Sequence, residues 1–172
     1  DRFAADAARA PLGVPCSEPG WVRPLDGTLA AIALTRAGHA EAGTRWSAAL
    51  RHEFALRRGR RAGWWWSPLG VGAGSMPPWE HAVTTALARA EGWIGDDDWA
   101  ALRAAALGAS ARGTAHPDDE RTIAAARVWL RFVDDEQAAR LLARPTVAHD
   151  PLAVALDCYA SSIPVHEEVT AR

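Results

Sequence analysis

Residues 25–37 read LDGTLAAIALTRA, and this apolar stretch decides the fold. Its apolar residues fall on nearly every side of a helix, which is typical of a helix packed by several neighbours. Gly38 follows directly, as expected of a residue that ends a helix. The next stretch, residues 40–58, predicts a second helix with one buried face, because apolar residues recur at every fourth position. These residues are Ala42, Trp46, Leu50 and Phe54.

Further helix starts are marked along the rest of the chain. Each has proline or acidic residues where a first turn would begin, followed by apolar residues at helical spacing. They stand near Pro77, Asp96, Pro117, Asp134 and Asp150. The start at Asp134 is read as a capping-box variant completed by Gln137. We therefore expect an all-α fold: a single domain of about six to seven helices, arranged as antiparallel helical hairpins in a bundle or an α/α-hairpin stack.

Two stretches fall outside the helical pattern. Residues 1–24 form a proline-rich lead-in, extended over residues 11–24. Residues 59–76, GRRAGWWWSPLGVGAGSM, form a Trp/Gly-rich loop inside a helical domain that spans residues 25–163, and residues 164–172 form a tail. Long loops within compact domains are often functional, so the loop is the first candidate for a site.

Composition excludes several classes of protein. A chain of 172 residues is long enough for one domain with a core, and its net charge of −2 argues against general nucleic-acid binding. No apolar run approaches the length of a membrane span, so no transmembrane segment is expected. The chain has no Lys, which excludes a P-loop lysine and Schiff-base chemistry.

The two cysteines indicate a reducing compartment. Cys16 and Cys158 show no zinc-ligand spacing, and two cysteines do not make a disulfide framework. Cys158 lies in an apolar stretch, where a free and buried thiol is the ordinary outcome. We therefore expect a cytoplasmic protein with reduced thiols, and a disulfide between the two residues is the alternative.

The loop concentrates residues that bind ligands. Arg61 precedes three consecutive tryptophans, Trp64, Trp65 and Trp66, and Trp79 follows at the next helix start. Cations next to large aromatic rings can hold an anionic ligand, stack on bases or cover the face of a sugar. The alternative is that these rings pack on the core. The leading hypothesis is a helical binding or accessory protein in which these five residues contact a small-molecule ligand or a protein partner.

Acidic residues at helix starts support a second hypothesis. Glu80 and His81 open the helix after the loop, and Asp118 and Asp119 open another. Such groups can act as general acid and base, which would make the protein an all-α enzyme acting on a carbohydrate or isoprenoid-like substrate. Glu80 and His81 diverge by about 100° around a helix, so only one of them can face a given cleft. A third possibility is a structural piece of a larger assembly.

Residues 115–120, AHPDDE, resemble the signature of the zinc-dependent de-N-acetylases that act on N-acetylglucosaminyl substrates. The resemblance implies His116 and Asp119 as zinc ligands and Asp118 as the base. The chain departs from the family, because no glycine pair follows Glu120 and the chain has no HxxH. A helix start with proline and acids in its first turn explains the same letters.

Residues 132–136, FVDDE, are similar to the start of the aspartate-rich motif of isoprenoid synthases, which are all-helical. The resemblance implies carboxylates that bind the magnesium holding a diphosphate, with residues 96–98 as a second acidic cluster. Ala138 stands where that motif has another acid, and the asparagine of the partner motif cannot occur in a chain without Asn. A capped helix start again explains the letters. We therefore expect neither a metal site nor a cofactor.

Overall fold

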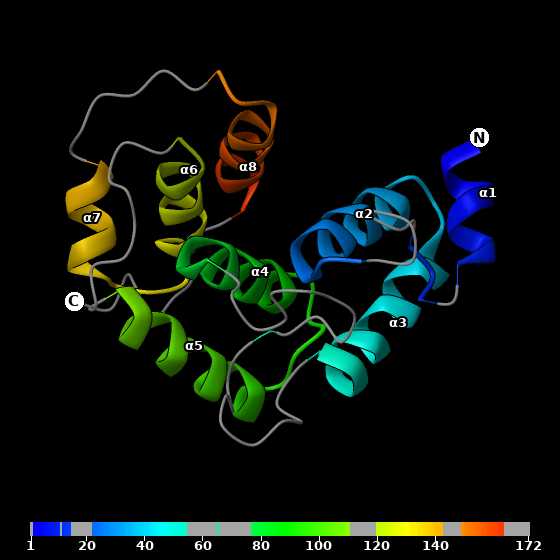
Figure 1. Cartoon of the computed structure of the whole chain (residues 1–172), viewed down its shortest axis with the longest axis horizontal. Helices are drawn as coiled ribbons and strands as arrows, with labels where there is room; N and C mark the ends of the chain where they lie inside the picture. The colour runs from blue at the N-terminus through cyan, green and yellow to red at the C-terminus, as the bar shows by residue number, and fades with distance from the viewer. Residues whose placement is uncertain are drawn as a thin grey trace.

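The computed structural model describes residues 2–10, 12–14, 22–54, 65, 77–110, 120–142 and 149–163. Within these ranges the chain forms eight α-helices, one short π-helical turn and no strand (Figure 1). The predicted all-α fold is confirmed. The elements are α1 (Arg2–Arg9), α2 (Pro24–Arg36), α3 (Ala40–Ala49), the π-helical turn η1 (Leu50–Phe54), α4 (Pro78–Ala90), α5 (Asp96–Ser110), α6 (Glu120–Trp129), α7 (Glu136–Leu142) and α8 (Pro151–Ser162).

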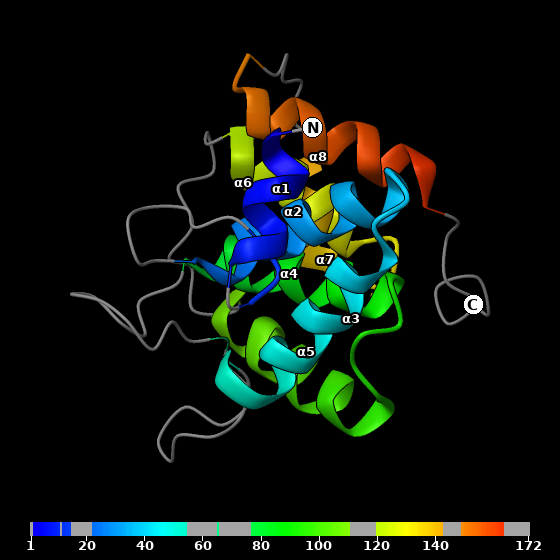
Figure 2. The same ribbon diagram turned by 90° about the vertical axis from the view of Figure 1, so that its right-hand side faces the viewer.

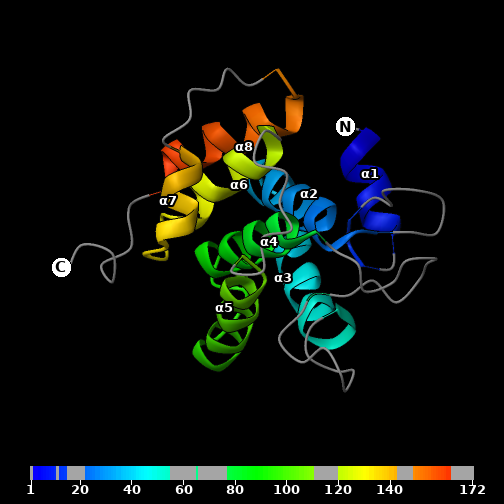
Figure 3. The same ribbon diagram turned by 60° about the vertical axis from the view of Figure 1, so that its left-hand side comes forward.

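Helices α2 to α8 form a stack of hairpins. Helix α2 packs against α3, α4 against α5, and α6 against α7. The even-numbered helices also pack on one another in chain order, α2 on α4, α4 on α6 and α6 on α8. Figures 1 and 3 show α4 between α2 and α6. The architecture is therefore a row of even-numbered helices, each of the first three with an odd-numbered partner.

The N-termini of the even-numbered helices lie on the same side of this row. The charges of Asp26, in the first turn of α2, and of Arg121, at the start of α6, both act on Glu80 in the first turn of α4. Arg121 also pairs with Asp150, the N-cap of α8, at 2.8 Å. Four helix N-termini therefore gather at one end of the molecule.

On the opposite side of the row, one polar cluster connects the C-terminal ends of the helices. The hydroxyl of Tyr159, late in α8, donates to the carboxylate of Glu91, which follows α4, over 2.8 Å. Arg36, in the last turn of α2, lies 3.6 Å from the same carboxylate, and its guanidinium stacks 4.9 Å from the centre of the Tyr159 ring. Helices α2, α4 and α8 are thus joined where they end.

Helix α4 is the centre of the core. Residues 80–88 are all buried, because α2, α5 and α6 pack around this helix. The sequence stripe of Trp79, Val83, Leu87 and Ala90 describes only one of its packed sides, and Ala90 is exposed. Most of the neighbouring helices are anchored by one large ring each: Trp46, Trp99 and Trp129 are all buried.

Trp46 of α3 lies across α2. Its ring is fully buried, and its Nε1 donates to Oγ1 of Thr28 over 3.0 Å. A Cβ atom at Gly27 would overlap the six-membered ring of Trp46. Glycine at this helical position therefore allows α2 and α3 to approach closely.

Helices α2 and α4 end in the same way. Gly38 and Gly92 have φ of +95° and +68°, and the residue after each donates its backbone N–H to the carbonyl five residues earlier at 2.9 Å. This closing turn satisfies helix carbonyls and requires a left-handed residue, which glycine supplies at little cost. The predicted stop at each of these glycines is confirmed.

Some local predictions are wrong. Helix α1 lies within residues 1–24, where no helix was predicted; it packs on α2 and α3 through Ala7 (Figure 2). Helix α3 ends at Ala49 and continues as the π-helical turn η1, instead of running on as one regular α-helix. Cys158 is exposed rather than buried, because α8 turns Leu156 and Tyr159 into the core.

The cap of α7 is Asp135 rather than Asp134. Its Oδ1 accepts the backbone N–H of Ala138 and its Oδ2 accepts the indole N–H of Trp129, both over 3.2 Å. Because Asp135 is buried and fixed by both bonds, the FVDDE letters are explained by a capped helix start. None of the described helices is long and apolar enough to span a membrane.

Candidate functional site

Trp65, the described residue of the stretch 59–76, is bound to α4. Its ring is fully buried, and its Nε1 donates to Oγ1 of Thr85 over 2.8 Å. That hydroxyl donates in turn to the carbonyl of His81 over 2.8 Å. The backbone N–H of Trp65 donates to Nδ1 of His81 over 3.4 Å. Backbone and side chain of Trp65 are therefore both bound to the first two turns of α4.

The imidazole of His81 is a neutral group of the core. Its Nε2 lies 3.1 Å from the carbonyl oxygen of Leu102, which only accepts, so Nε2 carries the proton and Nδ1 is left to accept from Trp65. Burial lowers the pKa of His81 to about 4, against a smaller opposing effect of the Leu102 hydrogen bond. At neutral pH the imidazole is therefore uncharged, and protein groups occupy both of its nitrogens.

Glu80 lies beside His81 but on another side of α4. It is 7% exposed, and none of the hydrogen bonds of the described residues involves its carboxyl group. Burial raises its pKa to about 7; the carboxylate of Asp26 adds to this rise, and the guanidinium groups of Arg23 and Arg121 oppose it. A carboxyl group in this state exchanges its proton near neutral pH, as functional carboxyl groups often do.

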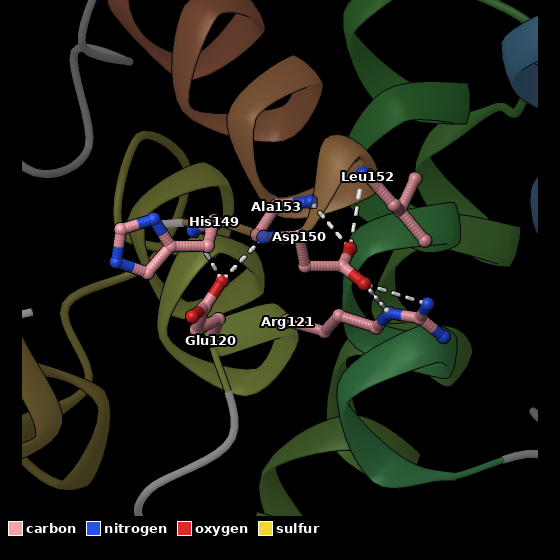
Figure 4. Close-up of polar contacts among 6 residues, drawn as sticks. All are labelled: Glu120, Arg121, His149, Asp150, Leu152 and Ala153. Carbon is pink, nitrogen blue, oxygen red and sulfur yellow. Dashed lines mark hydrogen bonds and ion pairs between the residues drawn. The ribbon is translucent and has the colours of Figure 1, made fainter. Parts of the chain in front are cut away.

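Arg121 is held in place by the start of α8. Its Nε and Nη2 donate to Oδ2 of Asp150 over 3.1 and 2.8 Å (Figure 4). Oδ1 of Asp150 accepts the backbone N–H groups of Leu152 and Ala153, which caps α8. The Arg121 hydrogen bond and this capping lower the pKa of Asp150, so the pair is ionised at neutral pH.

Glu120 ties the same two helices together from the other side. Its Oε2 accepts the backbone N–H groups of His149 and Asp150, both over 2.6 Å (Figure 4). These bonds lower the pKa of Glu120. The starts of α6 and α8 are therefore a fixed polar scaffold, whereas Glu80 has no such partner.

The structure places the sequence-predicted residues as follows. Trp65 contacts His81 at the start of α4, Glu80 lies on another side of the same helix, and Trp79 is half-buried against the core. Trp65 points into the interior, and its fully buried ring belongs to the hydrophobic core. The remaining candidates, Arg61, Trp64, Trp66, Asp118 and Asp119, lie outside the described residues. No group of three or more His, Cys, Asp or Glu able to hold a metal occurs within the described part of the chain.

Sequence reasoning missed that Asp26 and Arg121 approach Glu80. One signal was present: proline is followed two residues later by an acid at 24–26 and again at 78–80. In both places the proline opens an even-numbered helix, so the acid stands in its first turn. Equivalent positions in two hairpins of a stack lie at the same end, which brings the two carboxyl groups near one another.

The chain gives no match to protein-family models, to curated proteins or to solved structures. Its function is therefore inferred from its own residues.

Proposed function

We propose that this protein is a helical binding protein that takes a small-molecule ligand at the amino-terminal end of α4. The observation that carries the proposal is the attachment of Trp65, by backbone and side chain, to His81 and Thr85 of α4, the helix that also carries the buried side chain of Glu80. Trp64 and Trp66 are the covalent neighbours of this anchor, and Trp79 directly precedes Glu80. Aromatic rings combined with a few polar groups are typical of small-molecule sites.

The groups have distinct roles in this proposal. The rings of Trp64, Trp66 and Trp79 cover the body of the ligand, while Glu80 takes one polar group of it. Trp65 holds the loop and does not touch the ligand, since its ring is buried. Arg61 gives the loop a cation for an acidic group on the ligand. The protein partner considered above is the alternative occupant.

A thermal-shift screen tests this proposal. Neutral, anionic and cationic small molecules are added to the wild type and to the Trp64→Ala/Trp66→Ala double variant. A ligand at about 100 times its Kd stabilises by about 2.7 kcal/mol, so at least one compound should raise the Tm of the wild type by several degrees and leave the double variant unchanged. Trp93→Ala, a half-buried residue just beyond the other end of α4, is the matched control and should keep the shift. An identical shift in the double variant would contradict the proposal.

A second candidate function is an all-α enzyme acting on a carbohydrate or isoprenoid-like substrate. The observation that favours it is the pKa of Glu80, which burial raises to about 7, the value that suits a general acid or base. Glu80→Gln should then reduce turnover of a nitrophenyl glycoside panel by about 10²-fold or more while leaving the helical circular dichroism unchanged. Equal turnover by wild type and variant excludes this role for Glu80.

A further inference from the structure

We propose that Glu80 and Thr84 receive the ammonium group of the ligand, so that the ligand class is an organic amine. This inference rests on the proposed binding function and specifies the chemistry of the same site. It is carried by two buried polar side chains that lie one helical turn apart and make no hydrogen bond within the described part of the chain.

Thr84 is the second of these side chains. It is fully buried, and its Oγ1 has no hydrogen-bond partner in the described part of the chain. It stands four residues after Glu80, and therefore on the same side of α4. A buried hydroxyl without a partner costs about 1–3 kcal/mol, and such groups are rare in native cores. The Thr84 hydroxyl, one turn from a buried carboxyl group, therefore indicates a place for a hydrogen-bonding guest.

The neighbouring side of α4 shows the contrast. His81 and Thr85 have the same spacing of four residues, and each is bonded to Trp65. The His81 ring also donates to the carbonyl of Leu102, and the Thr85 hydroxyl donates to the carbonyl of His81. Among the described residues, one pair of polar side chains is thus satisfied by groups of the protein, whereas the side chains of the adjacent pair, Glu80 and Thr84, make no hydrogen bond.

The charges around Glu80 favour a cationic guest. Asp26 raises the pKa of Glu80, which means that the two carboxylates repel each other and that a cation between them would relieve the repulsion. Arg23 and Arg121 act in the opposite direction, but Asp150 neutralises Arg121 by two hydrogen bonds. An anionic guest would meet both carboxylates.

The hydrogen-bonding capacity of the pair selects an ammonium group. An alkylammonium has three donors and no acceptor. An ionised carboxyl group only accepts, and the threonine hydroxyl has free acceptor capacity. A primary ammonium group is also about as small as a water molecule. A neutral hydroxyl guest would leave the repulsion between Asp26 and Glu80 in place.

Calorimetric titration with putrescine tests the inference, with 1,4-butanediol as the neutral compound of the same length. The wild type should bind putrescine and not the diol. Because Glu80 must give up its proton to pair with the cation, the affinity for putrescine should be about tenfold weaker at pH 6 than at pH 8. Glu80→Gln should lose at least about tenfold in affinity and the pH dependence, and Thr84→Val about three- to tenfold.

Two exposed residues of α3 provide matched controls. Glu41→Gln and Thr44→Val make the same chemical changes at the surface and should leave putrescine binding as in the wild type. Binding of putrescine that is unchanged by Glu80→Gln would overturn the inference. So would tight binding of the diol, or no heat with putrescine up to about 10 mM, a concentration that would reveal even a millimolar Kd.

The failures of the two proposals differ. If another compound gives a thermal shift that depends on Trp64 and Trp66 while putrescine does not bind, the binding site stands and the amine class is wrong. If no compound shifts the Tm of the wild type, both proposals fail. Circular dichroism of each variant shows that the comparison is made between folded proteins.

Discussion

The indole Nε1 of Trp65 donates a hydrogen bond to Oγ1 of Thr85 over 2.8 Å, across 20 residues of sequence, and both residues are fully buried. This bond joins Trp65 to the central helix of the stack. Because both groups of this hydrogen bond are buried away from water, the removal of either one leaves the other unpaired in the core.

Thr85→Val should therefore destabilise the protein by about 1–3 kcal/mol, because the indole N–H of Trp65 loses its acceptor. Trp65→Phe removes the donor and also some packed ring area, so it should cost a similar amount or more. The double variant should cost less than the sum of the two changes, as measured by urea unfolding. Thr44→Val at the exposed surface of α3 is the control. Strict additivity would show that the bond contributes nothing.

The pH dependence of stability should contain two opposing contributions from adjacent residues. Burial lowers the pKa of His81 from 6.5 to about 4, so the unfolded chain binds the extra proton and stability falls as pH falls from 6.5 towards 4. Burial raises the pKa of Glu80 from 4.5 to about 7, so the folded protein holds the extra proton and stability falls as pH rises from 4.5 to 7. Each contribution amounts to about 3 kcal/mol.

Glu80→Gln separates these two contributions. Between about pH 4.5 and 6.5 the contributions nearly cancel in the wild type, whereas the variant should gain stability steadily as pH rises. At pH 8 the variant should be more stable than the wild type by about 2–3 kcal/mol, because a buried carboxylate has been replaced by a neutral amide. Urea titrations at several pH values measure both effects. A wild-type advantage at pH 8 would show that the Glu80 carboxylate is stabilised by its surroundings.

Gly27→Ala should be strongly destabilising although alanine favours helices. The added Cβ would overlap the ring of Trp46, whose buried position leaves it no room to move. Overpacking of this kind costs about 1–3 kcal/mol, which exceeds the gain of about 1 kcal/mol in helix propensity. Trp46→Leu should cost less in the Gly27→Ala background than alone, because the clash is then absent. Equal costs in both backgrounds would contradict the close packing of α2 on α3.

Tyr159→Phe should destabilise by about 1–2 kcal/mol through loss of the hydrogen bond to Glu91. The ring that stacks under Arg36 remains, so the packing of α8 is otherwise preserved. Because Cys158 is exposed on the same helix, Cys158→Ser is the neighbouring control and should change the free energy of unfolding by less than about 0.5 kcal/mol. If Tyr159→Phe is as stable as this control, the hydrogen bond between Tyr159 and Glu91 does not stabilise the contact between the ends of α4 and α8.

The helices could be predicted from sequence because their signals are local. Gly38 and Gly92 end α2 and α4 where left-handed residues are required, and Asp150 with Pro151 opens α8 as expected. These features depend on residues only a few positions apart, as helix caps do. Asp135 rather than Asp134 caps α7, and its second carboxylate oxygen also accepts the indole N–H of Trp129, a contact that the capping pattern does not contain.

The site could be predicted only in part for the same reason. The sequence indicated Glu80, His81 and Trp65 by their residue types, but the roles of these residues depend on tertiary contacts. His81 is a neutral core group because Trp65 and Leu102 occupy its nitrogens, whereas the charges of Asp26 and Arg121 act on Glu80 without a hydrogen bond to it among the described residues. Thr84 had no signal at all, since a buried and an exposed threonine look alike in a helix.

The central claim is that the carboxyl group of Glu80 is a buried binding group that exchanges its proton near neutral pH. The most direct test is an NMR titration of the side-chain carboxyl carbon of Glu80, assigned by comparison with Glu80→Gln. We expect a midpoint near 7 in the free protein, and a clear downward movement of that midpoint when putrescine is added. A midpoint near the ordinary 4.5 that putrescine leaves in place would contradict it.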